Sequence, residues 1–278
     1  MFDFYLKVYR NILIIKRTPM LSHKQKTLLM ALTLSTQICI AEETSLLEIE
    51  REYVGELIAL QQYELATEHL KIVEKEFPQE DKWVASQYAH IYFHQGNFKE
   101  AIPFIEASQK NTISFIQQQK LMQWYLVSLE RTESYSKAIS TIKQVPEAYY
   151  KLDWFTKQTV DIIEATYQET VKQPANKRMV SRSDCIIIIT KILAVNPDTS
   201  SAPWLNYFLA EYEYDKLSAM MLRIESGNKK LTSADDDLMI QVFKVRSKFK
   251  AIEAENDLTL SERVNARLGY IEQLMKKL

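Results

Sequence analysis

The segment His94-Gln95-Gly96-Asn97-Phe98-Lys99-Glu100-Ala101-Ile102 decides the fold. Its pattern predicts the end of one helix, a tight Gly-Asn turn and the first turn of a second helix. Glycine readily adopts the left-handed conformation in which many helices end, and asparagine is a good N-cap for the helix that follows. The segment therefore predicts two antiparallel helices joined at Gly96 and Asn97.

The spacing of residues around this turn occurs three times in the chain. In each case an aromatic residue lies three positions before a small residue, and an aliphatic residue lies four positions after it. The small residues, at positions 66, 101 and 138, are 35 and then 37 positions apart. Small side chains suit the points where packed helices approach most closely. The three sets are Tyr63, Ala66 and Leu70; Phe98, Ala101 and Ile105; and Tyr135, Ala138 and Ile142.

This pattern resembles that of tetratricopeptide repeats, which are helix pairs with a period of about 34 residues. The resemblance covers residues 44–145 and 182–224, although Gln61-Gln62 and the turn at 131–134 lack the usual glycine. It implies an all-α fold in which TPR-like helix pairs form an α-solenoid over residues 42–228. It also implies a concave groove, lined by the first helix of each pair, that receives a ligand. The residues that the resemblance places toward this groove are Arg51, Ile58, Ser86, His90, Phe93, Gln123, Val127 and Glu130.

A proline follows two of the three helix pairs that we expect. The pairs cover residues 44–77, 81–109 and 112–145, and Pro78 and Pro146 follow the first and the third, since proline cannot continue a helix. Pro103 lies inside the second helix of the middle pair, where it predicts a bend.

The spacing becomes less regular after residue 146. It predicts a long helix over 147–172, a polar connection to about 181, and a helix from Ser183 or Asp184 to Val195. Cys185 would be a small buried residue of a fourth, stretched repeat, although the isoleucines at 186–189 also suit a strand. A further helical stretch runs from Pro203 to about residue 225, ending at Gly227-Asn228.

The last part of the chain has a seven-residue pattern. Apolar residues at 238, 242, 245, 249 and 252, and again at 264, 268, 271, 275 and 278, alternate steps of four and three. Such seams predict helices in lengthwise contact, here an antiparallel helical hairpin over residues 233–278. The hairpin either caps the exposed end of the repeats or forms a dimer seam. Two heptads are few for a coiled coil, so we favour the cap.

Residues 1–41 predict an N-terminal extension and a signal peptide. Lys24 and Lys26 precede an uncharged run from Thr27 to Ile40, and Ala41 offers a small residue for cleavage. This run has 14 residues, whereas a membrane span needs about 20. The alternatives are an uncleaved anchor, or a lipid anchor at Cys39 that the bulky residue before it disfavours. Met20 is a second possible start of translation.

Composition narrows the classes of partner. Without residues 1–41 the chain keeps 29 of its 35 basic and 35 of its 36 acidic residues, a net charge of −6. Nucleic-acid binding requires a basic face, so we expect no nucleic-acid partner. Four glycines in 278 residues leave no room for a glycine-rich phosphate loop, and we expect no cofactor.

The reactive side chains form no recognisable catalytic pattern, so we predict neither catalytic residues nor a metal site. His90 and His94 have the spacing of two helical metal ligands, but the segment between them lacks the glutamate of the metalloprotease motif. Cys185 precedes four isoleucines, and apolar surroundings make a thiol inert.

These observations predict a non-enzymatic scaffold that is exported to the periplasm or secreted and binds a peptide or a partner protein of the cell envelope. No stable membrane span is expected once the signal is cleaved. The alternatives are a peptidoglycan-acting envelope enzyme with an α-solenoid body, and a structural subunit of a secretion or export assembly. The identity of the partner and the oligomeric state are not encoded in any motif that we recognise.

Overall fold

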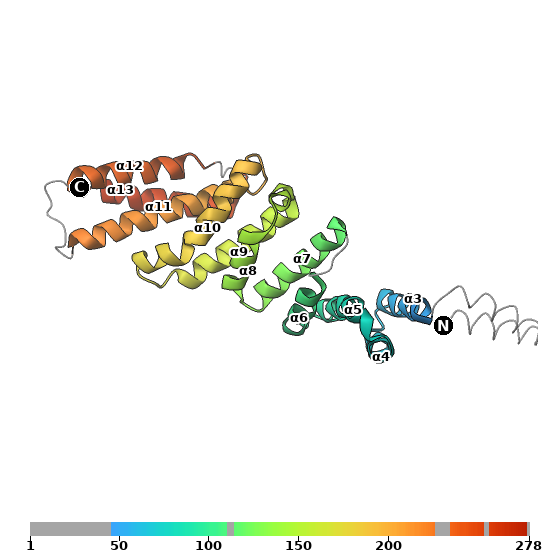
Figure 1. Ribbon diagram of the computed structural model, residues 1–278. Helices are drawn as coiled ribbons and strands as arrows, with labels where there is room; N and C mark the ends of the chain where they lie inside the picture. Colours follow the sequence, from blue (N-terminus) through green and yellow to red (C-terminus); the bar gives the residue numbers. More distant parts are fainter. Residues whose placement is uncertain (1–45, 110–113, 226–233, 253–255, 277–278) are drawn as a thin grey trace, which may run out of the picture. The chain divides into compact units, whose positions relative to one another are not determined.

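The computed structural model describes residues 46–109, 114–225, 234–252 and 256–276, and these residues form helices and no strand (Figure 1). The predicted all-α class is therefore confirmed. The expected signal peptide and the expected helix end at Gly227-Asn228 lie outside the described residues. The chain separates into two compact units, with the boundary between Tyr125 and Leu126. This boundary lies inside the segment that we expected to be one repeat domain.

The first unit is built from consecutive helices that pack on one another. The helix α3 packs on α4, α4 on α5, and α5 on α6. Apolar side chains of α3, α4 and α5, among them Val54, Leu70 and Ile91, form its core. The elements are α3 (Leu46–Ala59), α4 (Tyr63–Glu76), the short 3-10 helix η1 (Pro78–Glu80), α5 (Asp81–His94), α6 (Phe98–Gln109) and the first part of α7 (Phe115–Arg131).

The turns after α3, α5 and α7 have the same backbone geometry. One residue in each has a positive φ: Gln61 at 58°, Gly96 at 77° and Glu133 at 54°. The next residue donates its N–H to the carbonyl five positions earlier, and the positive-φ residue donates to the carbonyl three positions earlier, which is a Schellman motif. The first of these bonds, each 2.8 Å long, are Gln62 to Leu57, Asn97 to Tyr92 and Ser134 to Leu129. The predicted turn at Gly96 is confirmed, and two non-glycine residues adopt it as well.

The packing positions of the three sets behave as the spacing predicts. Ala66, Ala101 and Ala138 have no exposed surface. The aliphatic residues four positions later, Leu70, Ile105 and Ile142, are also completely buried. The aromatic residue of each set is half-buried.

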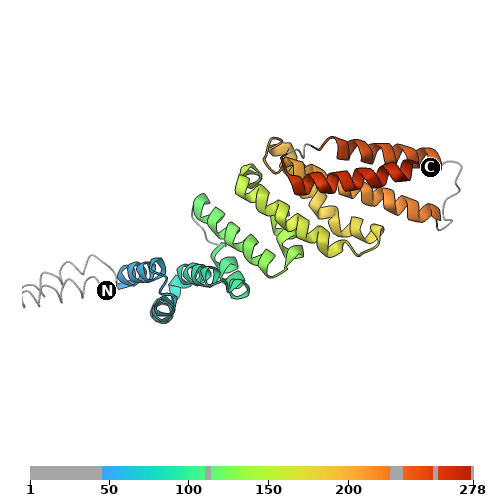
Figure 2. The same ribbon diagram turned by 180° about the vertical axis from the view of Figure 1, so that it is seen from behind.

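In the described residues, the second unit contains the end of α7, the short helix α8 and five helices, α9 to α13, that are longer than α3 to α6. The helix α8 packs on α9, α10 contacts both α8 and α9, and α11 lies along α10. In both views α12 and α13 lie beside α11 (Figures 1 and 2), and each of them contacts it. The elements are α8 (Tyr135–Gln144), the 3-10 helix η2 (Glu147–Lys151), α9 (Asp153–Thr170), α10 (Ala175–Val195), α11 (Ala202–Glu225), α12 (Ala234–Lys250) and α13 (Leu258–Met275).

The predicted long helix over 147–172 is wrong at its start. Residues 147–151 form η2, and the extended backbone of Leu152 (φ −92°, ψ 122°) separates it from α9. Tyr149 and Tyr150 are buried, and Tyr150 donates a hydrogen bond to the carbonyl of Ile142. Burial of these two rings favours the interruption over a continuous helix.

The predicted polar connection to residue 181 is also wrong, because α10 begins directly after Pro174. Proline suits a helix start, since its fixed φ is already compatible with helix. The first turns of α10 are held by Arg178 and Arg182, which both bond to Asp215 of α11. The isoleucines at 186–189 are helical rather than a strand. Cys185 is completely buried, as expected, and burial raises its pKa to about 12.

The C-terminal helices α12 and α13 confirm the predicted hairpin helices. The whole first seam is buried, from Leu238 to Phe249 in α12 and at Ile252, which follows that helix. In α13, Val264 and Ile271 are buried, and Leu268 and Met275 are half-buried. The last expected seam residue, Leu278, lies outside the described residues. Because α12 and α13 contact each other and α11, the apolar seams pack against helices of the same chain. None of the helices in the described ranges combines the length and apolar character needed to cross a membrane.

The turn geometry gives a test with a built-in control. Replacing Gly96 by alanine forces a side chain into positive φ and should lower the free energy of unfolding by about 1 kcal/mol, whereas Gln61→Gly should raise it by about 0.5 kcal/mol. Gly55, which is exposed in α3, has open space around it like Gly96 but lies in ordinary helical backbone. Gly55→Ala should therefore stabilise the protein. Urea unfolding of the three variants measures these changes, and a loss of stability in Gly55→Ala would contradict the assignment to φ.

Candidate functional site

A cavity of about 460 Å³ lies in the first unit, where α3, α5 and α7 contribute side chains to a common wall. We call it the groove. Two tryptophans, Trp83 and Trp124, give it aromatic surface, and Arg51, Lys82 and Lys120 give it positive charge. The residues that line it are Arg51, Gln79, Glu80, Lys82, Trp83, Ser86, Gln87, His90, Ser108, Gln117, Lys120, Leu121 and Trp124.

The structure brings three of the eight expected site residues together in this groove. Arg51 comes from α3, and Ser86 and His90 come from α5. Phe93 does not line the groove, but its ring stacks on Trp124 with a centroid distance of 5.3 Å. Ile58 is a core residue with 5% exposure, and it borders a smaller cavity of about 380 Å³ to which His90 also contributes.

The three expected residues of α7 are not among those that line the groove. Gln123 is exposed and Val127 is half-buried. Glu130 belongs to the second unit, where its carboxylate accepts a hydrogen bond from Gln158 (2.5 Å). Sequence reasoning missed two α7 residues that line the groove, the exposed Lys120 and Trp124, which is 8% exposed. A tryptophan with a lysine four residues before it was the available signal.

Trp124 is the centre of an aromatic cluster. The rings of His90, Phe93 and His94 lie 5.0, 5.3 and 5.6 Å from it, and Lys120 Nζ lies 4.8 Å from its centroid. Burial, helped by the nearby His94 and Lys120, lowers the pKa of His90 to about 4. Burial also lowers the pKa of His94. His90 is therefore neutral at pH 7 and offers a hydrogen-bonding ring without charge.

The groove is positively charged in a chain that is acidic overall. Arg51 forms an ion pair with Glu80 and lies over the ring of Trp83 at 5.5 Å. Lys82 and Lys120 are exposed. With His90 neutral, three cations face one carboxylate and the net charge is +2. Such a groove attracts a ligand that carries carboxylates.

Metal binding gains no support from the histidine pair. The rings of His90 and His94 are close, with centroids 4.6 Å apart. Within the described ranges, however, no group of three or more His, Cys, Asp or Glu residues is placed to hold a metal ion.

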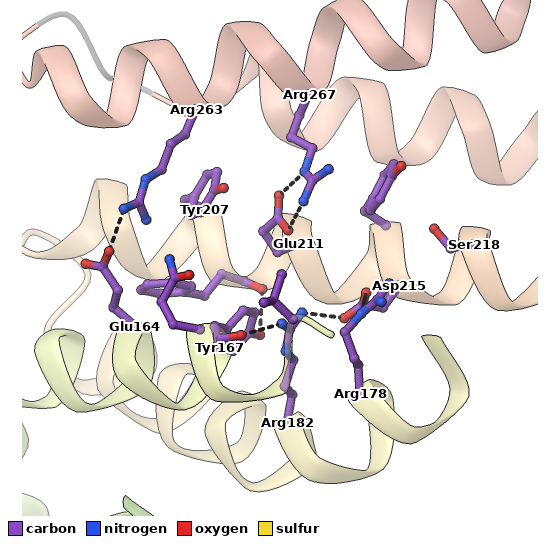
Figure 3. A pocket seen from close by; sticks show the side chains of 14 residues that line it. Glu164, Tyr167, Arg178, Arg182, Tyr207, Glu211, Asp215, Ser218, Arg263 and Arg267 are labelled. Carbon is purple, nitrogen blue, oxygen red and sulfur yellow. Dashed lines mark hydrogen bonds and ion pairs between the residues drawn. The ribbon is translucent and has the colours of Figure 1, made fainter. Parts of the chain in front are cut away.

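The second unit contains another cavity, of about 450 Å³, that sequence reasoning missed entirely (Figure 3). Its walls come from α9, α10, α11 and α13, and we call it the arginine pocket. Four arginines contribute to it in two pairs, each pair four residues apart on one helix. The sequence shows that each helix carries two arginines on one face, but nothing in it indicates that α10 and α13 approach the same part of α11. The arginines are Arg178, Arg182, Arg263 and Arg267.

Comparisons with models of known protein families, with curated proteins and with solved structures found no match for this chain. Function is therefore inferred from the residues of the two cavities.

The lowered pKa of His90 predicts an acid-sensitive first unit. Between pH 6.5 and about 4 the unfolded chain binds a proton at this residue that the folded protein does not, so stability falls as the pH falls through this range. In His90→Asn the fall should be shallower. Urea unfolding of both proteins at pH 7 and pH 4.5 measures the difference. Parallel slopes in the two proteins would show that carboxylates alone produce the acid sensitivity.

Proposed function

We propose that this protein is a non-enzymatic interaction scaffold that binds a peptide, or an extended segment of a partner protein, in the groove of the first unit. The supporting observation is that Arg51, His90 and Trp124, from three different helices, line one cavity. All three of these helices, α3, α5 and α7, are the first members of the expected pairs, as a tetratricopeptide-like solenoid requires. The groove size falls within the range of ordinary ligand sites, about 300–1,000 Å³.

The lining of the groove favours a peptide with acidic and apolar residues. Lys82 and Lys120 are exposed cations that carboxylates of a partner can approach. Trp83, which is half-buried, offers a flat surface on which an apolar side chain can pack, and tryptophan is enriched among residues that dominate binding energy. Trp124 is 8% exposed and mainly supports the wall of the groove. Gln87 and Gln117 carry amides, which can both donate to and accept from a peptide backbone.

The proposed site of action is the cell envelope. Its support is the N-terminal order of basic residues, an uncharged run and a small residue, which is typical of an export signal. A scaffold that acts there would hold a partner after both have been exported.

Selection from a random peptide library tests this function. We expect the protein to enrich peptides that combine Asp or Glu with an aromatic or aliphatic residue. The variant with Lys82→Glu and Lys120→Glu reverses both exposed charges and should weaken binding of a selected peptide by about tenfold or more. Fluorescence anisotropy with the labelled peptide measures the affinity.

A matched variant controls for overall charge. Lys71→Glu with Lys99→Glu makes the same change in net charge at exposed positions of α4 and α6, away from the groove. It should bind the selected peptide with nearly unchanged affinity. Equal losses in the two variants would assign the effect to net charge and remove the groove from the proposal.

A further inference from the structure

The arginine pocket of the second unit has a layered arrangement of charge (Figure 3). Arg263 and Arg267 of α13 reach toward the cavity from one side, and Arg178 and Arg182 of α10 reach toward it from the other. The carboxylates of Glu211 and Asp215, which are one turn apart on α11, lie between them. The pocket is independent of the groove and of the function proposed for it.

One of the four arginines is buried and is bonded entirely to other residues of the protein. Arg182 is 3% exposed and donates to Asp215 Oδ2 (2.7 Å), to Thr170 Oγ1 (2.9 Å) and to the carbonyl of Tyr167 (2.9 Å). Its guanidinium also lies 3.9 Å from the ring centroid of Tyr167. These bonds satisfy a buried cation, which is costly to leave unpaired. Arg182 thus holds α9, α10 and α11 together.

The two arginines of α13 keep hydrogen-bonding capacity. Arg263 makes one hydrogen bond, from Nη2 to Glu164 (2.5 Å), and its side chain is 31% exposed. Arg267 pairs with Glu211 through Nε (2.5 Å) and Nη2 (2.9 Å) and is 36% exposed. Neither Nη1 atom donates to any residue that the structure describes. Each guanidinium carries five N–H donors, so both side chains can bind a further acceptor.

Charge and shape indicate which acceptor fits. Four arginines face three carboxylates, Glu164, Glu211 and Asp215, so the pocket has a net charge of +1. One negative charge neutralises the pocket, whereas a dianion would leave it with a net charge of −1. The planar fork of arginine matches the geometry of a carboxylate. Tyr214, which is half-buried, supplies ring surface beside these donors, and the guanidinium of Arg267 lies 4.5 Å from its centroid. Tyr207 and Phe208 also line the pocket but are buried.

We propose that the arginine pocket binds a small organic carboxylate with a single negative charge, held by Arg263 and Arg267 beside the ring of Tyr214. Residues one turn apart on a helix are close neighbours, so one ligand can contact both guanidiniums. Glu164 competes with the ligand for Arg263, and Glu211 orients Arg267.

Protection from arginine modification tests this site in the full chain. Phenylglyoxal reacts with accessible arginines, and mass spectrometry reports the rate at each one. Benzoate, a carboxylate with an aromatic ring, should slow modification of Arg267 by about threefold or more relative to chloride at equal ionic strength. Inorganic phosphate should protect less than benzoate. Arg246, which is 29% exposed and pairs with Glu272 outside the pocket, serves as an internal control whose rate stays the same.

Two variants change the affinity in opposite directions. Arg263→Gln should raise the benzoate concentration that halves modification of Arg267 by about tenfold, because it removes a charged donor. Glu164→Gln removes a competing carboxylate and should lower that concentration by about threefold. A purely structural ion pair between Glu164 and Arg263 predicts loss of stability in both variants and a gain of binding in neither.

Several results would overturn the proposal. Equal protection by chloride and benzoate would reduce the effect to screening by salt, and equal protection of Arg246 would make it nonspecific. Stronger protection by phosphate would reject the assignment to a single negative charge. Weaker binding by a folded Glu164→Gln protein, checked by its thermal unfolding, would reject the role of Glu164 as competitor.

Discussion

Three times in the chain, after α3, α5 and α7, only three residues separate a helix from the next one, and this short reversal organises the first half of the protein. The reversal requires one residue at positive φ, which is most comfortable for glycine. Gly96 adopts it as expected, and the non-glycine residues Gln61 and Glu133 adopt it as well, with the same hydrogen-bonding pattern. A constant turn sets the register of each helix pair. Constant register explains why Ala66, Ala101 and Ala138 are all completely buried although only one of the three turns contains glycine.

Much of the fold was predictable because it depends on local spacing. The buried seam of α12 follows directly from apolar residues in steps of four and three. The errors arose where distant partners decide the structure. Residues 173–181 look polar and irregular, yet Arg178 and Arg182 become helical because they bond to Asp215, more than thirty positions away. No local pattern contains that information.

The sequence predicted which helices line the groove better than it predicted which residues of those helices do so. Arg51, Ser86 and His90 follow from the expectation that first helices face the ligand. On α7 the expected residues were Gln123, Val127 and Glu130, whereas Trp124, the residue after Gln123, lines the groove. A shift of one residue rotates a side chain by about 100° around a helix, since a turn takes 3.6 residues. The arginine pocket was beyond prediction, because four separate helices form it.

The burial of Cys185 has a practical consequence. It is the one free cysteine in the part of the chain that the structure describes, and it has no exposed surface in α10, which contacts α8, α9 and α11. A thiol with a pKa raised to about 12 stays protonated, and the thiolate is the reactive form. Alkylation at this position must therefore wait until the helices around it separate. The rate at which a thiol reagent labels Cys185 therefore measures how often the second unit opens, and no cysteine has to be introduced for the measurement.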